Sequence, residues 1–254
     1  MFALGLLARL AYVLLVDEPI LYTSQYFYLF GALRIVEDPD PLRLVATSDE
    51  WRLWGGHWTI APLYYLFVAG LLKVFGAALL PVQVVQCVLG ALGAVAVGVL
   101  GREAAGPRGA WAGAAYALYW PSVEMSRRLL TENLHVVRVV WALALLARGS
   151  RRLARGEVAA GGALLGLSAL ARSVSLVFVP LAAWLARPPR GSRRRWALPA
   201  AVLLAAVAAI LPWSARNLLG TGSLAPIETV GAYNLLKDNA YERLRRYQGD
   251  FFFE

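Results

Sequence analysis

The chain has 254 residues, 59% of them hydrophobic, and it carries a formal net charge of +9. Its mean hydropathy is +0.56 and apolar runs recur along most of its length, which excludes an ordinary soluble domain. The runs are continuous rather than alternating, so the strands of a β-barrel are disfavoured. We predict an all-α polytopic membrane protein, in which the positive charge reflects membrane topology and not nucleic-acid binding.

Seven apolar runs have the composition of membrane-spanning helices, although several are short. In chain order they are Phe2–Val16, Leu80–Gly101, Gly109–Ser122, Leu129–Ala147, Val158–Ala171, Val174–Ala186 and Trp196–Leu211. An eighth run, Thr59–Phe75, is ambiguous by hydrophobicity alone. We therefore predict about seven spans, and the distribution of arginine decides what the eighth run does.

Arginines gather in three of the loops between the predicted spans. The loops Gly101–Gly109, Arg148–Glu157 and Arg187–Arg195 together carry eleven arginines and two acids. They share one side of the membrane only if the eighth run does not cross it. The other side then holds the loop Asp17–Trp58, with seven acids and three arginines. The positive-inside rule therefore predicts a cytoplasmic N-terminus and a long first outer loop, residues 17–78, that contains non-spanning interfacial helices.

This topology divides the chain into two parts. Residues 1–212 form the predicted seven-span membrane module, and residues 213–254 form the start of an outer-face region. The sequence Phe251-Phe252-Phe253 would be an exposed apolar patch at a natural terminus. We therefore expect the outer-face region to be truncated at Glu254.

Three arginines at the predicted outer ends of the spans are candidates for binding an anion. Arg172 stands between two apolar runs, Arg216 follows the last span, and Arg128 precedes the fourth. A guanidinium group suits phosphate because its planar fork donates two hydrogen bonds at once. Each arginine also has a structural alternative. Arg172 could mark a turn, Arg216 could anchor the interface beside Trp213, and Arg128 could pair with Glu132 at i, i+4.

An acid and two histidines near the outer face are further site candidates. An acid at the edge of a span is costly and is therefore a functional candidate, which selects Glu132. His135 lies at i+3 on the same helical face, and Glu-x-x-His can form half of a metal site. A second copy of this motif is absent and the chain has two histidines, so we predict no metal, with a divalent ion as the alternative. His57, beside Trp58, is either a solvated loop residue or part of the site.

Several short motifs occur in a fixed order along most of the chain. They are Pro62-Leu63-Tyr64, Val74-Phe75-Gly76, Thr131-Glu132, Gly166-Leu167-Ser168-Ala169-Leu170-Ala171-Arg172, Pro212-Trp213-Ser214-Ala215-Arg216-Asn217 with Gly220, and Gly231-Ala232-Tyr233-Asn234-Leu235 with Asn239. Together they resemble the N-terminal part of GT-C membrane glycosyltransferases of the protein-O-mannosyltransferase and aminoarabinose-transferase type.

The resemblance implies a function on the outer face of a bacterial inner (plasma) membrane. There a sugar would move from a polyprenyl-phosphate carrier to a protein, lipid or glycan acceptor. The partners would be these substrates and the membrane lipids, with no nucleic acid. The resemblance also implies a site role for Glu132, and the motif after the last span makes Asn217 a further candidate.

The sequence departs from this family where the catalytic base is expected. The family carries an acid four residues before a tyrosine that starts a short amphipathic helix, and here Ser24 and Gln25 precede Tyr28. Neither can act as a carboxylate base, so Asp49 and Glu50 are the nearest substitutes. Two other functions stay open. One is a non-catalytic binder of lipid-linked sugar, or degenerate paralogue. The other is a transporter or flippase, although transporters usually show an internal repeat and none is visible.

Overall fold

A computed structural model describes residues 1–16, 23–38, 61–188, 195–222 and 224–228 of the chain. Within these ranges all the regular elements are helices, as predicted. In chain order they are α1 (Phe2–Leu15), α2 (Thr23–Glu37), α4 (Leu63–Phe75), α5 (Leu79–Ala105), η2 (Pro107–Ala110), α6 (Trp111–Ala117), α7 (Trp120–Glu124), α8 (Thr131–Arg152), α9 (Arg155–Ala169), η3 (Ser173–Val177), α10 (Phe178–Leu185) and α11 (Ala197–Thr221).

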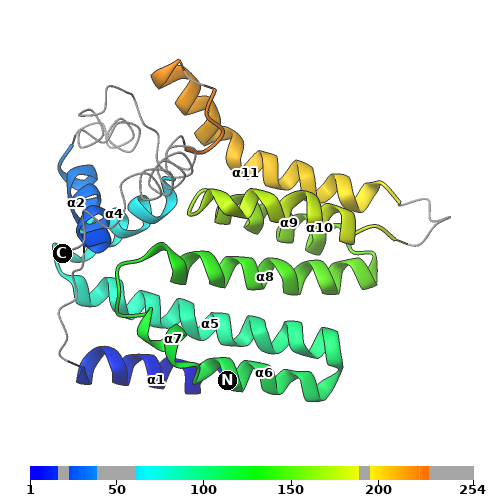
Figure 1. Cartoon of the computed structure of the whole chain (residues 1–254), viewed down its shortest axis with the longest axis horizontal. Coiled ribbons are helices and arrows are strands. Elements are labelled where there is room, and N and C mark those ends of the chain that lie inside the picture. The colour runs from blue at the N-terminus through cyan, green and yellow to red at the C-terminus, as the bar shows by residue number, and fades with distance from the viewer. Residues whose placement is uncertain (17–22, 39–60, 189–194, 223, 229–254) are drawn as a thin grey trace, which may run out of the picture.

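The long helices lie side by side in a bundle, and α2 and α4 lie at one end of it (Figure 1). Helix α5 packs against α1, α6 and α8, while α9 packs against both α8 and α11. We call the end where α2 and α4 pack together the α2–α4 end. The opposite end carries the turns near Arg102, Arg151 and Arg187, and we call it the arginine-rich end.

Glycines allow α9 and α11 to approach closely. A Cβ atom at Gly162 would lie 2.5 Å from the carbonyl oxygen of Val202, and one at Gly166 would lie 2.5 Å from that of Ala206. A side chain at either position would therefore push the two backbones apart. Close backbone approach through small residues is typical of helices in membranes, where van der Waals packing replaces the hydrophobic effect as the main attraction.

Two of the described helices are long and apolar enough to cross a membrane by themselves. They are α5 and the segment Ala197–Leu219 of α11. The other predicted spans coincide with helices that are short, such as α1 with 14 residues, or rich in charge, such as α8. The predicted run Val174–Ala186 also begins with the 3-10 turn η3 before α10. In the described part of the chain, most helix positions agree with the prediction but the count of seven spans is not confirmed.

The prediction of Gly109–Ser122 as one helix is wrong. The segment is divided among η2, α6 and α7, with a break after Ala117. In a continuous helix the Ala117 carbonyl would accept the N–H of Pro121, and proline has none. The fully buried guanidinium group of Arg9 bonds this carbonyl instead, over 3.0 Å, and also donates to Ser122 Oγ over 2.8 Å. The Arg9 side chain of α1 thus supplies the donor that Pro121 cannot offer to the Ala117 carbonyl.

Candidate active site

Segments far apart in the sequence are joined by hydrogen bonds at the α2–α4 end. The Leu63 N–H at the start of α4 donates to the Leu170 carbonyl, just past the end of α9, over 2.9 Å. The Leu129 N–H, shortly before α8, donates to the buried Gln25 side chain of α2 over 3.1 Å. The starts of α4 and α8 are therefore fixed relative to α2 and α9, and the side chains at these helix ends share one surface.

A buried glutamine of α5 supports this surface from within the bundle. Gln86 accepts a hydrogen bond from the Tyr64 hydroxyl of α4 over 3.0 Å. Its amide donates to the carbonyls of Ser126 and Arg128 over 3.2 and 3.1 Å. Burial raises the pKa of the Tyr64 hydroxyl well above its usual value, so Tyr64 remains the donor in its bond. One side chain thus fixes α4 and the turn before α8 on α5.

Two predicted site residues, Glu132 and Arg172, form an ion pair on this surface. Glu132 lies in the first turn of α8, where the helix dipole favours a negative charge. Arg172 directly precedes η3, and its backbone N–H donates to the Ser168 carbonyl over 2.9 Å. The side chains of Arg172 and Glu132 are 42% and 39% exposed, so a ligand can reach the pair.

A second carboxylate, Glu228, lies beside this pair. One of its oxygens accepts a hydrogen bond from the hydroxyl of Ser173, the residue after Arg172. The other accepts the Ala61 N–H over 3.2 Å. Glu228 therefore connects the segment after α11 to the segment before α4 and to the turn that carries Arg172.

The motif at the end of α11 holds the segment that carries Glu228. The Ile227 carbonyl accepts hydrogen bonds from the Trp213 ring N–H over 3.0 Å and from the Asn217 amide over 3.1 Å. The same amide donates to the Ala225 carbonyl over 3.0 Å. Asn217 is fully buried, so its described contacts position Glu228, and a direct contact with ligand stays a prediction.

The Tyr28 hydroxyl of α2 lies among these charges. Burial raises its pKa, and a hydrogen bond with Thr131 lowers it. The charges of Glu132 and Glu228 raise the same pKa, whereas the charge of Arg172 lowers it. Tyr28 is therefore a neutral hydroxyl near pH 7. The three charged side chains therefore lie within electrostatic reach of this one hydroxyl. Tyr28, Glu132, Arg172 and Glu228 together form what we call the Arg172 site.

One protein family matches the chain. The family described as dolichyl-phosphate-mannose-protein mannosyltransferase matches residues 59–215, more than half of the chain. The chain belongs to this family. No curated protein and no solved structure matches it. The match confirms the GT-C resemblance of the sequence motifs.

Membership in the mannosyltransferase family supports a membrane glycosyltransferase of the GT-C type. The matched residues contain Glu132, Arg172 and the helices that support them, and they end before Glu228. They also begin after Tyr28. The Arg172 site therefore combines residues inside the matched region with residues on both sides of it.

Arg128, which was predicted to bind the donor phosphate, forms an ion pair with Glu124. The i, i+4 partner of Arg128 is thus Glu124 and not the predicted Glu132, which pairs with Arg172. The neighbouring Arg127 is buried and donates to the Val13 carbonyl of α1 over 2.9 Å. The two arginines before α8 thus connect this turn to α1 and to α7.

Arg216, the other predicted phosphate ligand, lies near the end of α11. Its guanidinium carbon lies 4.8 Å from the centre of the Trp213 ring, and its Nη1 donates to Asn217 over 3.4 Å. A cation over an aromatic ring favours the alternative of an interfacial anchor. The role of Arg216 as a phosphate ligand stays a prediction.

His135 lies one turn after Glu132, in a buried polar cluster. Its Nδ1 is 2.9 Å from the hydroxyl of Ser168 and 3.3 Å from that of Ser175, and both serines are fully buried. The two hydroxyls are 3.1 Å apart. This cluster joins α8 to the turn on both sides of Arg172. Among the described residues, no group of three or more His, Cys, Asp or Glu is placed to hold a metal ion.

Several predicted residues lie outside the described part of the chain. They are Asp49, Glu50 and His57, together with the side chain of Ser24. Reasoning from the sequence missed Glu228 and Tyr28. Glu228 did carry a signal, because it is the only acid in the sequence between Trp213 and Lys237. Tyr28 also carried one, because the family resemblance places a tyrosine at this position after the expected acid.

Proposed function

We propose that the protein transfers a sugar from a polyprenyl-phosphate carrier to an acceptor at the outer face of the membrane, with the Arg172 site as its active centre. The observation that supports this most is an accessible arginine paired with Glu132, with a second carboxylate beside it. Sugar transfer of this kind needs a cation for the phosphate and a carboxylate for the proton. The loop charges support a cytoplasmic N-terminus and an outer α2–α4 end. The family resemblance of the sequence motifs supports a bacterial inner membrane as the setting.

Arg172 binds the phosphate of the donor in this mechanism. Its planar guanidinium group has five N–H donors, and Glu132 occupies one side of the fork, which leaves donors for phosphate oxygens. Negative charge grows on the leaving phosphate as its bond to C1 of the sugar breaks, and a fixed cation stabilises that charge. Glu132 holds the guanidinium group in place and acts as a positioning residue.

A carboxylate accepts the proton of the acceptor. The acceptor oxygen or nitrogen forms a bond to C1 of the sugar, the bond from C1 to the phosphate oxygen breaks, and polyprenyl phosphate leaves as an anion. The proton of the acceptor passes to the base. Glu228 is our first candidate for this base because it lies beside the phosphate-binding arginine. Asp49 and Glu50 remain candidates from the sequence.

A non-catalytic binder of lipid-linked sugar is the second candidate, and Gln25 favours it. Ser24 and Gln25 stand where the family's acid is expected, and the side-chain oxygen of Gln25 already accepts the Leu129 N–H. An amide cannot take a proton as a carboxylate does. If no other acid replaces it, the site holds the donor without transferring the sugar.

The test is saturable binding of a radiolabelled polyprenyl-phosphate hexose to the purified full chain, compared with Arg172→Ala. Losing one charge-assisted contact costs about 1.5–3 kcal/mol, so the affinity is expected to fall about ten- to a hundredfold. Arg108→Ala is the matched control, because Arg108 is an exposed arginine at the other end of the bundle. Its affinity is expected to equal that of the unmodified protein.

The same preparation separates the two candidate functions. Release of free polyprenyl phosphate in the presence of acceptor identifies an enzyme, whereas saturable binding without release identifies a binder. Equal affinities for Arg172→Ala and the unmodified protein would remove Arg172 from the site. Absence of saturable binding by the unmodified protein would contradict both candidates.

A further inference from the structure

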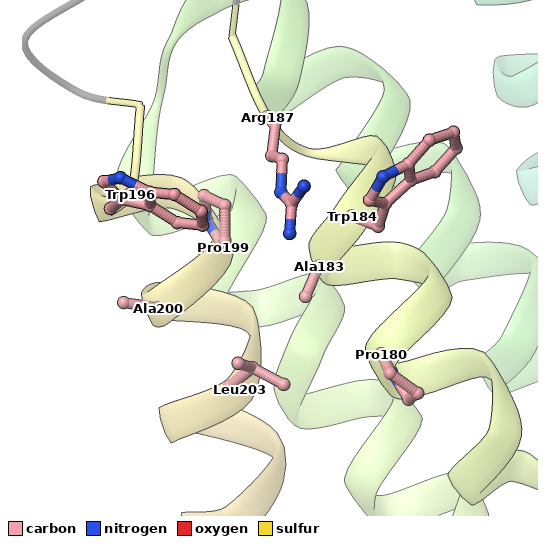
Figure 2. A pocket seen from close by; sticks show the side chains of 8 residues that line it. All are labelled: Pro180, Ala183, Trp184, Arg187, Trp196, Pro199, Ala200 and Leu203. Carbon is pink, nitrogen blue, oxygen red and sulfur yellow. The ribbon is translucent and has the colours of Figure 1, made fainter.

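An apolar groove lies between α10 and α11 at the arginine-rich end, far from the Arg172 site. Its volume is about 350 Å³. Figure 2 shows its walls, which are built from small and aliphatic side chains with a tryptophan on either side of the opening. The lining residues used below are Pro180, Ala183, Trp184, Trp196, Ala200 and Leu203. A cavity with these walls fits a hydrocarbon chain.

Arg187 places a positive charge at the opening of this groove. Its guanidinium group lies between the rings of Trp184 and Trp196 (Figure 2). The guanidinium carbon is 5.0 Å from the centre of the Trp196 ring, and that of Arg195 is 5.6 Å from the same ring. In the described part of the chain, neither arginine pairs with a carboxylate. The Trp196 ring thus contacts both guanidinium groups and leaves their positive charges unbalanced.

The surroundings of the groove are those of a membrane interface. Tryptophan concentrates at the level of the lipid headgroups, and Trp184 and Trp196 are 55% and 61% exposed. Beyond them, α10 and α11 expose aliphatic side chains along their length, including Leu181, Leu204 and Val207. The groove therefore opens towards an apolar surface on one side and two arginines on the other.

We propose that this groove binds an anionic glycerophospholipid. The phosphate accepts hydrogen bonds from Arg187 and Arg195, and an acyl chain lies in the groove along Ala183, Ala200 and Leu203. A zwitterionic headgroup fits less well, because its own ammonium group meets two cations that no described carboxylate balances. A free phosphate would leave the apolar walls uncovered. The site needs only the membrane setting and is independent of the sugar transfer proposed above.

The test measures lipid binding to the purified full chain by native mass spectrometry, with phosphatidylglycerol and phosphatidylcholine offered in equal amounts. Phosphatidylglycerol is expected to bind in preference. Each arginine near a headgroup contributes about fivefold in affinity, so Arg187→Gln with Arg195→Gln is expected to lower phosphatidylglycerol binding by about 25-fold. Arg102→Gln with Arg108→Gln is the control, because it removes two exposed arginines from a different loop at the same end. This control is expected to bind as the unmodified protein does.

A second variant tests the groove itself. Leu203→Trp fills the apolar space at a position that is 42% exposed and therefore tolerant of a larger side chain. It is expected to weaken phosphatidylglycerol binding severalfold while all the arginines remain. Four results would overturn the proposal: no phosphatidylglycerol binding by the unmodified protein, equal binding of the two lipids, equal losses in the two double arginine variants, or displacement of the lipid by inorganic phosphate.

Discussion

The Arg172 site and the groove beside Arg187 both present accessible arginines, but they differ in what lies next to them. At the Arg172 site, Glu132 and Glu228 accompany the arginine, and a neutral tyrosine hydroxyl lies among the charges. At the groove, tryptophan rings accompany the arginines and no described carboxylate pairs with them. Arginine alone can hold an anion, whereas arginine with carboxylates can also hold and move a proton.

The two places also differ in how they are assembled. The groove is lined by two helices that follow one another in the chain, α10 and α11. The Arg172 site needs α2, the segment before α4, the start of α8, the turn after α9 and the segment after α11. We therefore expect the Arg172 site to be more sensitive to changes in packing than the groove.

The largest expected effect concerns Glu228. If it is the base, Glu228→Gln lowers the rate of sugar transfer by about 10²- to 10⁴-fold, because an amide cannot accept the proton. Donor binding is expected to change by less than about tenfold, since Arg172 keeps its charge. Glu103→Gln, which removes a carboxylate at the arginine-rich end, serves as the control. Full transfer activity in Glu228→Gln would leave Asp49 and Glu50 as the candidates.

A substitution in the middle of the bundle is expected to lower the stability of the fold that carries both the Arg172 site and the groove. At Gly162, the Cβ of alanine would meet the Val202 backbone at 2.5 Å and force α9 away from α11. Overpacking of this kind destabilises a protein by about 1–3 kcal/mol. Thermal unfolding in detergent measures the loss. Gly70→Ala is the control, because nothing lies within 4 Å of the added atom. A Gly162→Ala protein as stable as the control would show that the helices separate without cost.

The ion pair of Glu132 and Arg172 is expected to have a smaller effect, visible in a double-mutant cycle. Donor affinity is measured for Arg172→Ala, Glu132→Gln and the double variant. Because both side chains are more than a third exposed, solvent weakens the pair, and the coupling is expected to be at most about 1 kcal/mol. A coupling of zero would mean that Glu132 does not position Arg172, and the role of Glu132 would then be independent.

The smallest expected effect is on pH dependence. The pKa values of Tyr28 and Tyr64 are raised, mainly by burial, on helices that we predict to lie outside the spans. A raised pKa means that the folded protein holds its proton more tightly, so this stability is complete below about pH 10 and is lost as the pH rises through the folded pKa values. Tyr28→Phe with Tyr64→Phe is expected to flatten the fall in thermal midpoint above about pH 10. An equally steep fall in the variant would contradict this.

The positions of the helices could be predicted because continuous apolar runs and the residues that end them are local features. The run Leu80–Gly101 corresponds to α5, Leu79–Ala105. The division of Gly109–Ser122 was predictable in principle, since Pro121 cannot donate in a helix. The compensating bond from Arg9 was not, because its partner carbonyl lies 108 residues away.

The candidate site could be predicted only in part, for the same reason. Glu132 and Arg172 were each selected by their places at the ends of apolar runs, but their pairing joins residues 40 positions apart. Glu228 reaches Ser173 across 55 positions and Ala61 across 167. No periodicity or motif spacing encodes such contacts. They follow from the order in which the helices pack.

The buried Arg9 has a consequence for the biogenesis of the protein. Within α1 the guanidinium group can reach only the Gly5 carbonyl, at 3.0 Å, and its other described partners lie on α6 and α7. A charged side chain in the bilayer is costly until it is satisfied. Helix α1 therefore cannot complete the contacts of Arg9 until more than a hundred further residues have been made. A nascent chain arrested before Ala117 has emerged from the ribosome is expected to leave α1 accessible to water-soluble reagents, and one arrested after Ser122 has emerged is expected to protect α1.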